Sequence, residues 1–128
     1  MPVIYQKRIC RDDLRRNPDA IYLFGDNEAR TGLGGQAREM RAEPNAFGIA
    51  TKKSPYEFWS DETFECNTFT MYGDYLKINR AKQKYKTIII PSDGLGTGLA
   101  QLATCAPKTF EYLTGVLKLI VADWKGDA

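Results

Sequence analysis

The segment from residue 20 to residue 35, AIYLFGDNEARTGLGG, decides the fold. Its first five residues, Ala20 to Phe24, are apolar without a break, and the run ends at Gly25. Such a run predicts a strand buried on both faces, as in sheets covered by helices on either side. The glycine-rich turn from Gly25 to Gly35 then leads into a predicted helix over roughly 35–41.

The same order of strand, glycine-rich loop and helix occurs again near residue 90. A predicted strand over 86–91 contains three consecutive isoleucines and runs straight into the loop Ser92 to Gly98. The other predicted strands cover 3–7 and 45–51, and a short helix covers 11–16. A long helix over 61–85, which Gly73 weakens and could interrupt, has an apolar face of Phe64, Phe69, Tyr72, Leu76 and Ile78. The last helix covers 107–123, with Phe110, Leu113, Leu117, Ile120 and Val121 on one side.

Buried strands that alternate with helices predict an α/β domain with a mainly parallel or mixed sheet, covered on both faces. In such sheets ligands bind at the carboxyl ends of the strands, where the loops enter helices. Both glycine-rich loops should therefore open on the same edge of the sheet. A chain of 128 residues fits one domain, 1–128, and leaves little room for a second.

Charge and hydropathy argue against several classes of partner. The 18 basic and 16 acidic residues are interspersed and leave a net charge of +2, which demands neither nucleic acid nor a membrane surface. No apolar run approaches the roughly 18 to 20 residues that span a bilayer, and the N-terminus lacks the apolar core of a signal peptide. We therefore expect a cytoplasmic protein without a membrane partner.

The absence of histidine removes much catalytic chemistry. With three widely spaced cysteines and no histidine, the chain has no Cys/His zinc site, Ser-His-Asp triad or Cys-His dyad. We predict no metal and no cofactor, and we expect each cysteine to be a small buried apolar residue. Any catalysis would have to use carboxylates, lysine, tyrosine, hydroxyl groups, water or the substrate itself.

The first glycine-rich loop has the composition of a ligand loop. Gly32, Gly34 and Gly35 let the backbone approach a ligand closely, and the following helix offers free N–H groups to an anion. Asp26 and Asn27 are expected just past the strand end, where they could hydrogen-bond ribose or a base. The alternative is a purely structural tight turn that one of these two side chains caps.

The second loop strengthens the first interpretation. Three glycines, at 94, 96 and 98, alternate after the buried strand, with the hydroxyls of Ser92 and Thr97 among them. This arrangement suits a diphosphate wrapped in backbone amides. It is neither a P-loop nor a dinucleotide-binding fingerprint, because the lysine of the first and the spacing of the second are missing. Two such loops in one small domain favour a nucleotide-type pocket over a structural role.

Three segments resemble macro domains, over roughly residues 19–114. The stretch from Asp19 through Asn27 to Gly35 resembles their first ligand loop, and Ser92 to Leu99 resembles their phosphate loop. Asn45 to Lys53, with its Gly-Ile-Ala-Thr-Lys pattern, resembles the central strand of macro-like proteins. The resemblance is greatest to the branch that removes ADP-ribose from protein carboxylates through a lysine, and to small macro-like proteins of bacteriophages.

The resemblance implies a three-layer α/β/α macro-domain-like fold with a mixed central sheet, and host cytoplasm as the location if a phage encodes the chain. It implies ADP-ribose or a related nucleotide as ligand, free or carried by an ADP-ribosylated protein or nucleic acid. Asn27 would bind the distal ribose, three glycines of the first loop would line it, and the second loop would hold the diphosphate. The full predicted ligand-binding set is Gly25, Asn27, Gly32, Gly34, Gly35, Thr51, Ser92, Gly94, Leu95, Gly96, Thr97 and Gly98.

One position departs from the glycohydrolase pattern. Lys52 matches the lysine nucleophile of that branch, but the assisting aspartate after the second loop is replaced by Ala100. Asp26 and Asp93 are the substitute acids, although Asp93 could instead cap its loop or recognise a base. Three functions stay open: a nucleotide-binding module, an active ADP-ribosyl hydrolase that uses Lys52 or an aspartate, and a non-catalytic nucleotide sponge or interaction protein. Ala100 favours binding over hydrolysis.

Aromatic residues gather around the middle of the chain. Phe47, Tyr56, Phe58 and Trp59 could stack on a base, or they could belong to the core. Aromatic side chains at such positions belong more often to the core, and the sequence alone leaves the two alternatives open.

Overall fold

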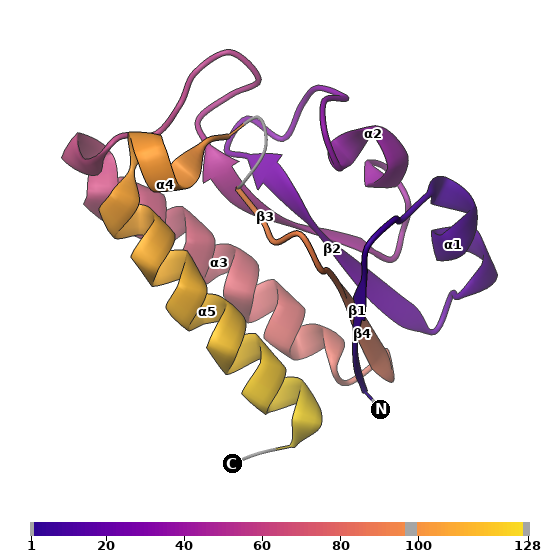
Figure 1. Ribbon diagram of the computed structural model, residues 1–128. Helices are drawn as coiled ribbons and strands as arrows, with labels where there is room; N and C mark the ends of the chain where they lie inside the picture. The colour runs from indigo at the N-terminus through magenta and orange to yellow at the C-terminus, as the bar shows by residue number, and fades with distance from the viewer. Residues whose placement is uncertain (1, 97–99, 127–128) are drawn as a thin grey trace.

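The computed structural model describes residues 2–96 and 100–126, which form three layers (Figure 1). The middle layer is a sheet of four strands in the order β1-β4-β2-β3. The strands are β1 (Val3–Gln6), β2 (Ala20–Asn27), β3 (Ala46–Lys52) and β4 (Thr87–Pro91). Helices cover both faces, so the predicted three-layer α/β architecture is confirmed.

All three strand pairings in the described part of the chain are parallel. The prediction of a mixed sheet was therefore wrong. The physical reason is the connectivity: a helix lies between each strand and the next along the chain, and a helical crossover returns the chain in the same direction.

The helices divide between the two faces of the sheet (Figure 1). Short helices α1 (Arg11–Arg16) and α2 (Ala37–Met40) cover one face, and long helices α3 (Phe64–Ala81) and α5 (Pro107–Lys125) cover the other. A 3-10 turn, η1 (Asp61–Thr63), precedes α3, and a further short helix, α4 (Leu102–Cys105), precedes α5. Among the described residues, no helix combines the length and the apolar character needed to cross a membrane.

The first five residues of β2 fill the core on both sides, as their apolar run predicts. Tyr22 and Phe24 pack with Met40 in one apolar cluster, beneath α1 and α2. Ile21 and Leu23 belong to the other cluster, beneath α3 and α5. All of these side chains are buried, so β2 is the central element of the fold.

The predicted apolar face of α3 was wrong in part. Phe69 is 83 % exposed and Tyr72 is also exposed, whereas the buried positions include Asn67 and Asp74. Hydrogen-bond partners in the core make the burial of these two polar side chains tolerable. The Asn67 amide donates to the Thr109 hydroxyl at 3.0 Å, and Asp74 accepts the backbone N–H of Ala50 at 2.9 Å. Gly73 does not interrupt the helix.

The cysteines also differ from expectation. Cys10 and Cys66 are exposed, and Cys105 is partly exposed. Cys10 precedes α1 at its N-terminus, and Cys66 lies one position before the buried Asn67 on α3, where the helix faces solvent. Their positions follow the geometry of these elements and not the usual preference of cysteine for the core.

Tyr75 gives the fold a pH dependence above neutrality. Its hydroxyl donates to the Asp123 carboxylate at 2.6 Å and joins α3 to α5. This hydrogen bond, with burial, raises the pKa of Tyr75 from 10 to about 12. Because the folded state holds the proton more tightly, the stabilisation is complete below pH 10 and is lost as the pH rises from about 10 to 12.

We expect the free energy of unfolding to fall by about 1 kcal/mol over that range, an amount reduced because the side chain is partly exposed to solvent. Urea unfolding at several alkaline pH values measures this slope. Tyr75→Phe should flatten the dependence of the unfolding free energy on pH. If the variant has the same slope as the wild type, other tyrosines cause the pH dependence.

Candidate functional site

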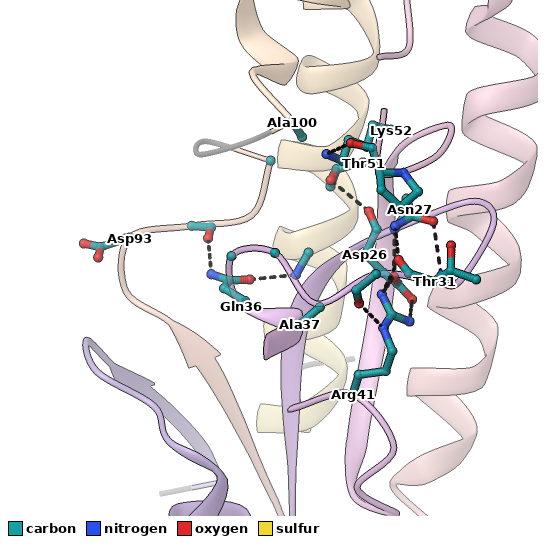
Figure 2. A pocket seen from close by; sticks show the side chains of 17 residues that line it. Asp26, Asn27, Thr31, Gln36, Ala37, Arg41, Thr51, Lys52, Asp93 and Ala100 are labelled. Carbon is teal, nitrogen blue, oxygen red and sulfur yellow. Dashed lines mark hydrogen bonds and ion pairs between the residues drawn. The ribbon is translucent and has the colours of Figure 1, made fainter. Parts of the chain in front are cut away.

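The two glycine-rich loops meet around one cavity of about 380 Å³ at the carboxyl ends of β2, β3 and β4 (Figure 2). Its lining residues are Gly25, Asp26, Asn27, Thr31, Gly32, Gly34, Gly35, Gln36, Ala37, Arg41, Thr51, Lys52, Pro55, Asp93, Gly94, Gly96 and Ala100. Most of the predicted site residues are thus brought together, on one edge of the sheet, as parallel strands require. Their roles in binding stay predictions.

Gln36 joins the two loops. Its Oε1 accepts the backbone N–H of Gly25 at 2.7 Å, and its Nε2 donates to the Gly94 carbonyl at 3.1 Å (Figure 2). One side chain therefore fixes the width of the cavity between the first loop and the second. Gln36 was not among the predicted site residues, although its position directly after the glycine run is the signal that could have found it.

Asn27 and Asp26 lie inside β2 and not past its end, which corrects the predicted boundary. The Asn27 Nδ2 donates to the Thr31 carbonyl at 2.7 Å, and the Thr31 N–H donates to Asn27 Oδ1 at 3.4 Å. Asn27 therefore folds the first loop back on the strand, the structural alternative considered for this residue. Contact with a ribose remains compatible with its place in the lining.

Asp26 is a buried, ion-paired carboxylate, 7 % exposed. It accepts from Arg41 Nη2 at 2.5 Å, lies 3.5 Å from Arg30 Nη1, and accepts the backbone N–H of Asn27 at 2.8 Å. These donors occupy the acceptor sites of the carboxylate. Asp26 is therefore suited to holding the loop and poorly placed to exchange a proton with a ligand.

The neighbouring strand leaves room for Asp26 only because residue 48 is glycine. A Cβ at Gly48 would lie 2.9 Å from both Cβ and Oδ2 of Asp26. Glycine at this position of β3 therefore allows the Asp26 carboxylate to lie beside the strand.

Arg41 ties the whole first loop together. Besides Asp26, its guanidinium donates to the carbonyls of Gly32 at 2.7 Å and Thr31 at 3.1 Å, and it lies 5.8 Å from the centre of the Phe24 ring. This arginine was not predicted as a site residue, because it lies at the end of a short predicted helix and belongs to no ligand motif. Arg41 and Lys52 are the two cationic side chains among the described lining residues.

The first loop offers unused backbone donors to the cavity. Gly32 and Gly35 have φ values of +89° and +57°, which side chains disfavour. Within the described residues, the N–H groups of Gly32, Gly34 and Gly35 donate to no protein acceptor. Groups of this kind are the usual ligands of phosphate oxygens in glycine-rich loops.

Lys52 is engaged at the edge of the cavity. Its Nζ donates to the Pro55 carbonyl at 3.1 Å and lies 5.8 Å from the centre of the Phe58 ring. Both contacts suit an ammonium group, whereas a nucleophile has to be a neutral amine. Ala100 is buried in the wall of the same cavity and supplies no acid.

The remaining predicted residues occupy varied places. Thr51 is buried, and its hydroxyl donates to the Asp26 carbonyl at 3.1 Å. Asp93 lines the cavity, but its carboxylate points away from the other labelled side chains in Figure 2. Ser92 and Leu95 lie outside this lining, and Leu95 belongs to the core. Thr97 and Gly98 lie outside the described residues.

The aromatic residues do not line the cavity. Trp59 is buried in the core, and Phe47 packs against Tyr85 with ring centres 6.0 Å apart. Tyr56 and Phe58 are exposed. In the described part of the chain, no three carboxylates or cysteines gather closely enough to hold a metal ion.

Comparison with known proteins identifies a family and no function. Residues 4–116 match the model of a family of unknown function (DUF7831), which covers most of the chain. No curated protein and no solved structure matches the chain.

Proposed function

Because the chain belongs to DUF7831, a family of unknown function, its activity has to be argued from the cavity, and we propose that it binds ADP-ribose or a related nucleotide diphosphate. One observation carries the proposal. Two glycine-rich loops, far apart in the sequence, form the walls of one cavity at the carboxyl ends of parallel strands. This is the place where open α/β sheets bind their ligands, and the resemblance to macro domains supplies the ligand class.

The charges around the cavity support an anionic ligand. Asp26 is paired with Arg41, and Asp93 is turned away, so neither carboxylate confronts a diphosphate. Within the described residues, the N–H groups of the first loop that donate to no protein acceptor supply partial positive charge. Lys52 lines the same cavity and adds an ammonium group whose hydrogen-bond acceptor, the Pro55 carbonyl, is neutral. The volume of about 380 Å³ is within the usual range of small-molecule sites, roughly 300–1,000 Å³.

Binding without cleavage agrees best with these contacts. Lys52 is held by the Pro55 carbonyl and the Phe58 ring, Asp26 is held by arginine, and position 100 is alanine. None of the three is poised as the nucleophile, acid or base of a lysine-type hydrolase. The same contacts would serve a free nucleotide or one attached to a protein or nucleic acid, and would also serve a nucleotide sponge.

The test is a calorimetric titration with ADP-ribose, AMP and NAD, repeated on Gly34→Asp. Gly34 is exposed and does not have a positive φ. An aspartate should therefore fit at this position without backbone strain. Its carboxylate would face the diphosphate, and we expect ADP-ribose affinity to fall about 100-fold or more. Gly96 is a poorer choice, since its φ is +74° and a Cβ there would lie 3.1 Å from Leu102.

Gly115→Asp is the matched control, because Gly115 is an exposed glycine of α5 where a Cβ meets nothing within 4 Å. Its affinity for ADP-ribose should stay within about twofold of the wild type. If none of the three nucleotides binds the wild-type protein, or if both aspartate variants bind equally well, the proposal is wrong.

A further inference from the structure

A second cavity, of about 460 Å³, lies between α5 and the ends of β1 and β4. Its interior is apolar. Ile90, Leu95 and Leu113 are buried there, with Phe110, Leu117 and Val121 beside them. The remaining lining residues are Tyr5, Pro91, Ser92, Gly94, Thr114, Lys118, Ala122 and Lys125.

The charges at this cavity have one sign. Of its described lining residues, only Lys118 and Lys125 are charged, and both are exposed. Within residues 2–96 and 100–126, neither lysine forms an ion pair with a carboxylate. An apolar interior with two unpaired lysines at its rim is complementary to an amphiphile with an anionic head.

The α5 wall of the cavity is long enough for an extended ligand. The α5 residues that line it recur at intervals of three and one, from Phe110 to Lys125, and thus form one continuous stripe on the helix. At 1.5 Å per residue, this stripe is about 22 Å long. The polar side chains in the lining are few: Tyr5, Ser92, Thr114 and the two lysines. A peptide would bury backbone groups here with few partners, whereas a hydrocarbon chain has none to satisfy.

We propose that this cavity binds an acyl chain that carries an anionic head group, with the tail along α5 and the head paired with Lys118 or Lys125. The site is distinct from the nucleotide cavity, although Gly94 lines both. The loop that contains Gly94 is therefore the wall between the two cavities. The proposal does not depend on the nucleotide-binding function.

The experiment is a calorimetric titration of the full chain with dodecanoate below its micellar concentration. We expect saturable binding of one molecule per chain. Dodecyltrimethylammonium, which has the same tail and the opposite charge, should bind at least about tenfold more weakly. The double variant Lys118→Glu/Lys125→Glu should weaken dodecanoate binding by about tenfold or more.

Two further variants distinguish the site from general effects. Lys82→Glu/Lys86→Glu makes the same charge change at two exposed lysines outside the cavity and should leave affinity within about twofold. Thr114→Trp, at an exposed lining position, should fill the cavity and abolish binding without changing the urea midpoint. Equal binding of both amphiphiles, or equal dodecanoate affinity in the wild type and both cavity variants, would overturn the proposal. Sedimentation that shows a dimer, converted to monomer by Thr114→Trp, would assign the cavity to a second copy of the chain and overturn it too.

Discussion

Arg41→Met should lower the free energy of unfolding by about 3 kcal/mol, because it leaves the buried carboxylate of Asp26 without its main partner. Asp26 is 7 % exposed, and Arg41 donates to it from Nη2 at 2.5 Å and Nη1 at 3.4 Å. Arg30 remains, but only at 3.5 Å. A buried charge that loses its partner costs more than the pair had contributed. Urea unfolding at neutral pH measures the loss.

Arg15→Met is the matched control for this prediction. Arg15 also pairs with a carboxylate, Glu43, at 3.3 Å, but its side chain is 63 % exposed. Water and the neighbouring Arg11 compensate for its removal, so we expect a loss below about 1 kcal/mol. If Arg41→Met and Arg15→Met lose the same unfolding free energy, the burial of Asp26 does not cause the loss in Arg41→Met.

The double variant Asp26→Asn/Arg41→Met separates the charge from the shape of the side chain. An amide at position 26 carries no buried charge, so the double variant should be more stable than Arg41→Met alone. Both Arg41→Met and the double variant lack the hydrogen bonds from Arg41 to the Thr31 and Gly32 carbonyls. Any ADP-ribose affinity that depends on the shape of the loop would therefore stay low in the double variant.

The sequence was sufficient to predict the architecture because apolar runs encode it locally. Ala20 to Phe24 and the three isoleucines before Pro91 are too continuous for a half-exposed strand, and both are buried central strands. The common edge of the two glycine-rich loops then follows, because parallel strands place their carboxyl ends together. The cavity was thus predictable in place and in most of its lining.

The side-chain contacts that shape the cavity were not predictable in the same way. Gln36 bonds to Gly94, and Arg30 bonds to Asp74, across long intervals of sequence that no local periodicity records. The buried face of α3 was misjudged for the same reason. Asp74 is stable in the core only because Ala50 and Arg30 donate to it, and neither partner is near it in the sequence.

Asn45→Asp should destabilise the protein more than any other single substitution considered, by about 4 kcal/mol at neutral pH. Asn45 is 4 % exposed, and its Nδ2 lies 3.0 Å from the Leu14 carbonyl, 3.1 Å from that of Asn17 and 2.9 Å from that of Ala20. This amide joins the end of α1 to the start of β2. Aspartate would replace the donor with a charged acceptor that faces three carbonyl oxygens.

Asn45→Ala provides the reference, since it removes the donor without adding a charge, and we expect a loss of about 2–3 kcal/mol. Repulsion by the carbonyls and burial raise the pKa of the introduced carboxyl group in the folded state above its unfolded value. Protonation at low pH therefore restores a donor, and the stability difference between the aspartate and alanine variants should shrink as the pH falls. Urea unfolding of both variants at pH values from neutral to acidic measures this difference. Equal stability of the two variants at every pH would contradict the predicted repulsion between the introduced carboxylate and the three carbonyl oxygens.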